Sequence, residues 1–436
     1  MSGSARSFLL QPGGRLRGSI QVPGDKSISH RAVMFGALAQ GRTRVTGFLD
    51  GADCLATLNA FTAMGAKAQR DGTRIEIQGC GLHGLRAPAQ PLDLGNSGTS
   101  MRLMAGLMAG QKFSTTLIGD ASLSRRPMGR VVLPLRSMGA SIQAAEGDRA
   151  PLNISPAEAL AGIEYRSPVA SAQVKSALLL AGLYAQGRTR VFEPAASRDH
   201  TERMLRAFGV NVDSENGSAA LTGGQALQAL DISVPADISS AAFYLVGAAI
   251  SPGSELTLRN VGMNPTRTGV LRILELMGAD ITVLEALEFG DEPVADLRVR
   301  GGELQGIDVP PELVASAIDE FPAIFVAAAC AQGQTRVTGA EELRVKESDR
   351  ISSMVDGLRL LGVDCEATPD GALIQGGPLG QGRIDSQGDH RVAMSFAMAA
   401  LRASGPIRID DCANVDTSFP GFVALAAQAG LQIQEQ

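Results

Sequence analysis

The sequence predicts an α/β protein made of six copies of one unit of about 70 residues. Two interleaved glycine series carry this prediction, because in each a glycine follows an apolar helical stretch and precedes a strand-like one. The first series is Gly41, Gly110, Gly187, Gly253, Gly333 and Gly405. The second, in which Met, Phe or Leu precedes most of the glycines, is Gly65, Gly139, Gly209, Gly278, Gly362 and, more weakly, Gly430. Two series with the same period are difficult to obtain by chance.

Each unit is expected to run strand–helix–strand–helix–strand, with room for one more strand. Each glycine of the two series is expected to be the left-handed residue that ends a helix before a strand. A unit this small must stack on copies of itself to bury its apolar faces. The residues alone leave open a ring, a solenoid or two groups of three, with a candidate seam at 234–237.

Composition excludes several classes of partner. The 436 residues carry a net charge of −6, and only 4% are aromatic, which disfavours nucleic acid and anionic membranes as partners. The longest apolar runs are too short to span a bilayer. The five cysteines and four histidines are scattered without a CxxC pair, so we expect neither a zinc site nor a disulfide framework, and a cytoplasmic location.

Polar residues gather at the six expected starts of the first helix of each unit, whereas the helix bodies are apolar. Ser27 or Ser29 is expected to cap the first of these helices, and Asp319 another. Capping does not explain the cations in these first turns, because positive charge opposes the helix dipole there. These cations are Lys26, Arg31, Arg102 and Arg391. If the starts converge, the field between them suits a multiply anionic ligand.

Two further stretches fit the same interpretation. Residues 123–129 place Arg125 and Arg126 in a turn before a helix. Residues 343–350 are expected to open a helix in which Lys346 and Arg350 flank Glu347. That group is either a helical salt-bridge set or a carboxylate able to act as a general acid or base. Asp319 has the same two interpretations, a helix cap or a base.

Together these motifs resemble the enolpyruvyl transferases, most closely the branch that acts on shikimate-3-phosphate. The resemblance rests on the stretches 23–31, 94–102, 125–129, 171–173, 197–200, 318–320, 344–350 and 389–391, which occur in the family's order. It implies a two-domain inverted α/β barrel-like fold, each domain holding three βαβαββ units, with the active site in the interdomain cleft. The implied domains are 23–235, mainly the shikimate-3-phosphate side, and 236–436 joined by the N-terminal strand in 1–22.

The implied reaction transfers the enolpyruvyl group of phosphoenolpyruvate to the 5-hydroxyl of shikimate-3-phosphate through a tetrahedral intermediate that expels phosphate. By resemblance Asp319 is the base at the hydroxyl, and Glu347 donates a proton to C3 with Lys26 nearby. The resemblance implies no metal or organic cofactor, a monomer, and binding of the inhibitor glyphosate in the phosphoenolpyruvate site.

The resemblance also assigns binding residues by position. Those on the shikimate-3-phosphate side are Lys26, Ser27, Arg31, Ser171, Ala172, Gln173, Ser197, Arg198, Asp319 and Lys346. Those on the phosphoenolpyruvate side are Lys26, Gly98, Arg126, Gln173, Arg350 and Arg391. Gly98 has no side chain, so the backbone and a small ligand can approach closely.

Three positions depart from the family's pattern. Asp416-Thr417-Ser418 stands where many members place a lysine before the Phe-Pro turn, which puts that lysine's phosphate contact in doubt. Glu342 stands where others have asparagine, and Ala172 replaces a serine, so any contact there uses the backbone.

Two alternative functions are open. One is the sister reaction on a UDP-amino sugar, whose family carries a Lys-Asn pair near the first helix and a reactive cysteine loop. Here Ser27 follows Lys26, and residues 111–130 hold no cysteine. The other is a non-catalytic repeat scaffold that binds polyanions; it predicts a broad basic surface, whereas the net charge is negative.

Overall fold

The computed structural model describes residues 6–215, 217–289 and 292–436. The chain divides into two compact units. We call Gly24–Val234 with Phe289–Glu292 the 24–234 unit. The 235–436 unit comprises Met1–Pro23, Pro235–Glu288 and Pro293–Gln436. The domain bounds expected above, 23–235 and 1–22 with 236–436, stay a prediction.

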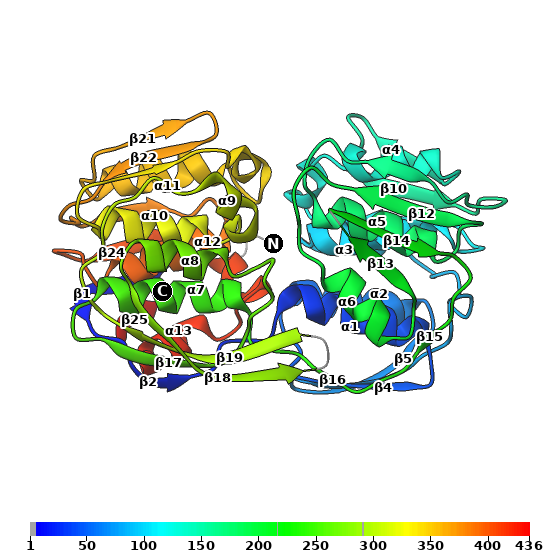
Figure 1. Cartoon of the computed structure of the whole chain (residues 1–436), viewed down its shortest axis with the longest axis horizontal. Coiled ribbons are helices and arrows are strands. Elements are labelled where there is room, and N and C mark those ends of the chain that lie inside the picture. The colour runs from blue at the N-terminus through cyan, green and yellow to red at the C-terminus, as the bar shows by residue number, and fades with distance from the viewer. Residues whose placement is uncertain (1–5, 216, 290–291) are drawn as a thin grey trace. The chain divides into compact units, whose positions relative to one another are not determined.

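Six sheets follow one plan in the described part of the chain (Figure 1). In the 24–234 unit the strand orders are β16(Ile232–Ser233)-β4(Arg42–Thr46)-β6(Arg74–Gln78)-β5(Lys67–Asp71), β7(Leu92–Asp93)-β8(Thr115–Ile118)-β10(Arg149–Ser155)-β9(Ser141–Ala145) and β11(Glu164–Arg166)-β12(Arg188–Phe192)-β14(Ser218–Thr222)-β13(Val212–Glu215). In the 235–436 unit they are β18(Asp280–Phe289)-β19(Glu292–Arg300)-β17(Glu255–Gly262)-β2(Arg17–Ile20), β20(Gln334–Val337)-β22(Gly371–Gln375)-β21(Cys365–Thr368) and β23(Gly382–Asp385)-β24(Ile407–Asp410)-β1(Phe8–Gly14)-β25(Leu431–Glu435). A small additional sheet pairs β3(Ala39–Gln40) with β15(Leu227–Gln228).

The shared plan is visible in strand direction. One strand runs parallel to its neighbour, as in β7–β8, β11–β12 and β23–β24, and that neighbour is antiparallel to the next strand. In the sheet of β20 an isolated parallel bridge between Asp308 and Arg336 takes the place of the parallel strand. The six sequence repeats therefore correspond to six copies of one β-and-α arrangement.

The first helix of each repeat is buried along most of its length. These helices are α1(Lys26–Leu38), α3(Gly98–Ala109), α5(Ala172–Gly182), α7(Ile238–Ile250), α10(Phe321–Cys330) and α12(His390–Ala399). The remaining α-helices are α2(Ala52–Ala63), α4(Gly129–Ser137), α6(His200–Ala207), α8(Gly269–Leu276), α9(Pro311–Ala317), α11(Arg350–Leu360) and α13(Phe422–Ala429). Each unit has its own apolar core around its buried helices, as the apolar helix bodies predict.

Close helix contact inside the 24–234 unit requires glycine at one point. A Cβ atom added to Gly106 on α3 would lie 2.1 Å from the backbone oxygen of Ala177 on α5. Any side chain at position 106 would therefore push these two central helices apart.

The two glycine series have different structural roles. All six members of the second series have positive φ, between 84° at Gly362 and 114° at Gly430, so their role as left-handed helix ends is confirmed. In the first series Gly41, Gly187, Gly253 and Gly333 have positive φ, but Gly110 (φ −88°) and Gly405 do not. The expectation that the first series ends helices in a left-handed conformation is wrong. Gly110 does cap α3, but its φ is negative. α1 already ends at Leu38, and the extended residue Ala39 follows it. Gly41 instead turns the chain from β3 into β4.

The N-terminal segment pairs with strands of the 235–436 unit, as the resemblance implies. β1 lies between β24 and β25, and β2 runs parallel to β17. Within the described ranges, no helix is both long and apolar enough to cross a membrane.

Candidate functional site

The start of α1 holds Lys26 beside a carboxylate. Asp25 caps this helix, since its Oδ1 accepts the Ile28 N–H at 2.8 Å. The expected cap by Ser27 or Ser29 is wrong, because Asp25 precedes the first turn directly and the Ser29 hydroxyl accepts the Leu49 N–H instead. Lys26 forms an ion pair with Asp53 on α2.

Arg31 is buried to 4% exposure and donates to three neutral oxygens. Its Nε lies 2.7 Å from Thr201 Oγ1, its Nη2 2.9 Å from Ser176 Oγ, and its Nη1 2.9 Å from the Ser27 carbonyl. Burial lowers the pKa of Arg31 to about 10 despite the opposing effect of nearby carboxylates. The group remains cationic at neutral pH, so the helix start carries a buried positive charge held by neutral partners.

The starts of α3 and α5 are joined through Gln173. Its Oε1 accepts from Arg102 Nη1 at 2.8 Å, and its Nε2 donates to Thr99 Oγ1 at 3.0 Å. Gly98 lies against two guanidinium groups, because an added Cβ would be 2.8 Å from Arg102 Nη1 and 3.2 Å from Arg126 Nη1.

Arg126 lies between a short 3-10 turn (η1, Leu123–Arg125) and α4, as the sequence predicts. Its Nη2 donates to Asn96 Oδ1 at 2.6 Å. Asn96 precedes the Gly98 helix start, so this bond links the Arg126 turn to the α3 start.

Ser171 and Ser197 both contact Glu193, which the sequence analysis missed. Ser171 begins α5 as its cap, and its N–H donates to Glu193 Oε1 at 2.8 Å. The Ser197 hydroxyl lies 2.8 Å from both Glu193 oxygens. One signal could have found this group: Lys175 stands alone as a charged residue in an apolar helix, and its ammonium pairs with Glu193 and Glu202. Ala172 is the first residue of α5, and Arg198 directly follows Ser197.

In the 235–436 unit, Asp319 is the centre of a cation cluster. Its carboxylate lies 3.2 Å from Arg350 Nη1, 3.8 Å from Lys346 Nζ and 3.9 Å from Arg391 Nη2. Arg391 also donates to the Asp319 carbonyl at 3.0 Å. The expected capping role of Asp319 is wrong, because α10 begins at Phe321 and Glu320 occupies the cap position. The Asp319 carboxylate contacts the three cations instead.

Arg350 is 1% exposed and contacts three carboxylates. Besides Asp319, its Nη2 lies 2.5 Å from Glu347 Oε2 and its Nε 2.8 Å from Asp389 Oδ2. Burial opposes the charge of Arg350, but the carboxylates of Asp389, Glu347 and Asp319 outweigh it and raise the pKa of Arg350. Burial likewise acts to raise the pKa of Asp389, and the Arg350 guanidinium overcomes it, so that this pKa is lowered.

Lys346 and Glu347 do not lie on a helix. Asp349 caps α11 by accepting the Ser352 N–H at 3.1 Å, and this helix begins only at Arg350. The predicted helical salt-bridge set is therefore wrong in geometry, although Arg350 does contact Glu347. Lys346 comes directly after a 3-10 turn (η2, Glu341–Val345), and its own backbone is extended.

Two positions that depart from the family's pattern also have ionic partners. Asp416 pairs with Arg6, and Glu342 Oε1 lies 3.7 Å from Lys346 Nζ. The negative charge of Asp416, which precedes Thr417, is therefore already paired.

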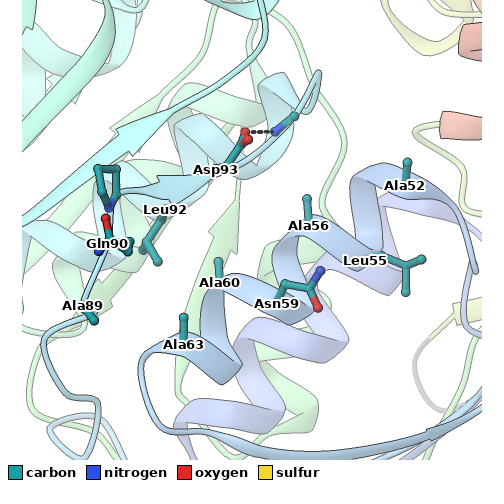
Figure 2. A pocket seen from close by; sticks show the side chains of 12 residues that line it. Ala52, Leu55, Ala56, Asn59, Ala60, Ala63, Ala89, Gln90, Leu92 and Asp93 are labelled. Carbon is teal, nitrogen blue, oxygen red and sulfur yellow. Dashed lines mark hydrogen bonds between the residues drawn. The ribbon is translucent and has the colours of Figure 1, made fainter. Parts of the chain in front are cut away.

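A separate hollow of about 750 Å³ lies beside α2 (Figure 2). One face of this helix lines it with Ala52, Leu55, Ala56, Asn59, Ala60 and Ala63. The opposite wall is the segment 89–93 with Gly95, in which Asp93 accepts the Gly95 N–H at 2.9 Å. Its lining contains none of the residues that the sequence assigns to the site.

Within each unit, three helix starts meet. In the 24–234 unit, Arg31 on α1 donates to Ser176 on α5, and His30 on α1 lies 3.4 Å from Ser97 Oγ at the α3 start. Gln173 at the α5 start accepts from Arg102 on α3. In the other unit, Ser239 at the α7 start donates to Glu320, and the α12 start reaches Asp319 through Arg391. Buried cations at clustered helix starts define an α/β repeat protein that binds small, multiply anionic molecules.

Comparison with known proteins identifies the family. The model of the EPSP synthase family (3-phosphoshikimate 1-carboxyvinyltransferase) matches residues 10–425. The 3-phosphoshikimate 1-carboxyvinyltransferase of Alkalilimnicola ehrlichii is 64% identical over 98% of this chain and 96% of its own length. That of Methylococcus capsulatus is 62% identical over 98% of each chain. A solved EPSP synthase from Acinetobacter baumannii superimposes with a TM-score of 0.89 at 53% identity, covering 99% of this chain and 100% of that one.

The chain therefore belongs to the EPSP synthase family. It is a transferase that moves the enolpyruvyl group of phosphoenolpyruvate to shikimate-3-phosphate in the shikimate pathway. The fold class and the acceptor that the sequence predicts are confirmed. The alternatives, a UDP-amino sugar acceptor and a non-catalytic scaffold, have no support in these relatives.

Proposed function

We propose that the cation clusters of both units take part in this reaction, with different tasks. Residues of the 24–234 unit supply most of the contacts to the substrate anions, Lys346, Arg350 and Arg391 of the 235–436 unit supply the others, and carboxylates of the 235–436 unit move the protons. The observation that carries this proposal is the Asp319 carboxylate, which lies within 3.9 Å of Lys346, Arg350 and Arg391. A single carboxylate among three cations suits a reaction of anionic substrates that needs a base.

The proposed shikimate-3-phosphate contacts are those assigned by resemblance: Lys26, Ser27, Arg31, Ser171, Ala172, Gln173, Ser197, Arg198, Asp319 and Lys346. Support comes from the meeting of the α1 and α5 starts, where Arg31 holds a buried charge on neutral partners. A helix start supplies backbone donors as well, which suits a phosphate or a carboxylate.

The proposed phosphoenolpyruvate contacts are Lys26, Gly98, Arg126, Gln173, Arg350 and Arg391. The close approach of two guanidinium groups to Gly98 supports this assignment. Glyphosate is proposed to compete here, because it is also a small molecule carrying several negative charges.

In the proposed mechanism Asp319 accepts the proton of the 5-hydroxyl as its oxygen bonds to C2 of phosphoenolpyruvate. Glu347 donates a proton to C3, giving the tetrahedral adduct. Glu347 then recovers a proton from C3 as the C2–O bond to phosphate breaks, and the double bond re-forms. Asp319 passes the proton of the 5-hydroxyl to the departing phosphate, so both carboxyl groups return to their starting state. Lys26 and the arginines stabilise the charge on the departing phosphate.

We further propose that the protein is a monomer and works in the cytoplasm. A reducing compartment is supported by its cysteines, since Cys54, Cys80, Cys330, Cys365 and Cys412 are all free thiols.

The test is phosphate release by Asp319→Asn, with Asp356→Asn as a matched control on the exposed face of α11. Loss of a base is expected to lower kcat by about 10²–10⁴-fold. The control is expected to keep wild-type turnover with shikimate-3-phosphate as the acceptor and to release no phosphate when a UDP-amino sugar replaces it. Wild-type turnover by Asp319→Asn would remove Asp319 from the mechanism.

A further inference from the structure

We propose that Glu193, which forms an ion pair with Lys175, is a positioning residue that holds Ser171 and Ser197 in place for shikimate-3-phosphate. The proposal rests on the proposed function, in which these two serines contact that substrate. It adds residues that contact no substrate themselves and act through the groups that do.

Glu193 connects two separate loops through one carboxylate. It follows β12, and its side chain is only 3% exposed. Its Oε1 accepts the Ser171 N–H at the start of α5, at 2.8 Å. Both of its oxygens lie 2.8 Å from the Ser197 hydroxyl, in the loop before α6. The carboxylate therefore fixes the distance between the two loops and orients both donors.

A buried carboxylate behind an anion-binding site needs a counter-charge, since it would otherwise repel the substrate's phosphate. Lys175 supplies this charge: its Nζ lies 2.9 Å from Glu193 Oε2 and 2.8 Å from Glu202 Oε1. Nζ also donates to the Ser197 carbonyl at 3.5 Å, which gives the loop before α6 a second contact to this ion cluster. Burial opposes the charge of Lys175, but Glu202 and Glu193 outweigh it and raise its pKa, which keeps the ammonium charged at neutral pH.

Glu202 provides a matched comparison. It shares the Lys175 ammonium with Glu193 and is equally buried. Its Oε1 contacts Lys175, whereas its Oε2 has no hydrogen-bond partner among the described residues. Both glutamates thus belong to the same buried ion cluster, but the contacts to Ser171 and Ser197 belong to Glu193. A purely structural cluster predicts the same outcome for either substitution, and a positioning role predicts different outcomes.

The experiment compares Glu193→Gln with Glu202→Gln in the full-length enzyme. Calorimetry gives the Kd of shikimate-3-phosphate, steady-state kinetics give KM and kcat, and thermal unfolding confirms that each variant is folded. Glu193→Gln is expected to raise the Kd and KM for shikimate-3-phosphate about tenfold, the size of one lost charged hydrogen bond. Its KM for phosphoenolpyruvate is expected to change less than about twofold, and Glu202→Gln to raise the Kd for shikimate-3-phosphate no more than about twofold.

Equal weakening by both variants, or no weakening by folded Glu193→Gln, would overturn the proposal. If Glu193→Gln does not fold, Glu193→Asp takes its place: it keeps the charge but is one methylene shorter, so the same tenfold effect is expected, and wild-type affinity would overturn the proposal.

Ser197→Ala separates this proposal from the proposed function. If Ser197→Ala leaves the Kd of shikimate-3-phosphate unchanged, Ser197 is not a substrate contact, and the proposed site fails together with the inference. If Ser197→Ala weakens binding but Glu193→Gln does not, only the inference fails. If both weaken binding, the double variant is expected to lose less affinity than the two single losses combined, because part of the effect of Glu193 passes through Ser197 and the rest through Ser171. Fully additive losses of affinity in the double variant would contradict a role of Glu193 through Ser197.

Discussion

Arg31 in the 24–234 unit and Arg350 in the 235–436 unit are both buried, yet their surroundings are opposite. Arg31 donates to the neutral oxygens of Thr201, Ser176 and Ser27, and burial lowers its pKa to about 10. Arg350 contacts the carboxylates of Asp319, Glu347 and Asp389, which raise its pKa. An arginine on neutral partners keeps its whole charge available for a substrate anion, whereas Arg350 shares its charge between three carboxylates and the phosphoenolpyruvate that it is proposed to contact.

This difference supports the proposed division of tasks between the two clusters. The surroundings of Arg31 favour binding, since a phosphate or carboxylate finds a positive charge there. The cluster around Arg350 favours proton transfer, since it holds Asp319 and Glu347 beside fixed cations. The predictions below test this division of tasks.

The largest expected effect is on turnover, from Glu347→Gln. An amide has no proton to donate to C3, so kcat is expected to fall about 10³-fold. The Kd of shikimate-3-phosphate is expected to change less than about threefold, as judged by calorimetry. A large loss of affinity with normal turnover at saturation would place Glu347 among the anchoring residues instead.

Arg31→Lys is expected to weaken shikimate-3-phosphate binding by about 10–100-fold. A lysine keeps the charge but cannot reach Thr201, Ser176 and the Ser27 carbonyl together, because it lacks the planar guanidinium fork. Saturating substrate is expected to restore most of kcat. Exposed Arg188→Lys in the same unit serves as the control, and an equal effect there would remove Arg31 from the binding site.

Gly98→Ala is expected to raise the KM for phosphoenolpyruvate about tenfold and to leave the Kd of shikimate-3-phosphate within about twofold. The new Cβ would lie 2.8 Å from Arg102 Nη1, so that guanidinium must move away from the helix start. Only the flexible end of the Arg102 side chain has to move, which limits the loss of phosphoenolpyruvate affinity. Equal changes for both substrates would show that position 98 affects the whole unit.

The smallest expected effect is on stability at low pH, through His30. This ring is fully buried beside Thr57 and Ser100, and burial, with Lys26 and Arg31 nearby, lowers its pKa well below 6.5. Below about pH 6.5 the unfolded chain binds a proton that the folded protein does not, so stability falls as the pH falls. His30→Asn is expected to remove this part of the pH dependence in denaturant unfolding between pH 5 and 7. An unchanged pH dependence would mean that other groups cause it.

The repeats, the six buried helices and their polar starts could all be predicted from the sequence, because glycine spacing and apolar runs are local signals. Capping could not: Asp25 displaced the expected Ser27 or Ser29, and Glu320 stands where Asp319 was expected to cap. At the first helix the residue two positions before Ser27 decided the outcome. At the second, the adjacent Glu320 precedes the helix, and cations from distant segments contact Asp319. Glu193 was missed for the same reason, since its partners Ser171, Ser197 and Lys175 are close only after folding.

The most direct test compares phosphate release by Arg31→Lys and Glu347→Gln as shikimate-3-phosphate is raised to saturation. The division of tasks predicts that saturation restores most of the turnover of Arg31→Lys and none of that of Glu347→Gln. Recovery of Glu347→Gln by excess substrate, with Arg31→Lys remaining inactive, would contradict it.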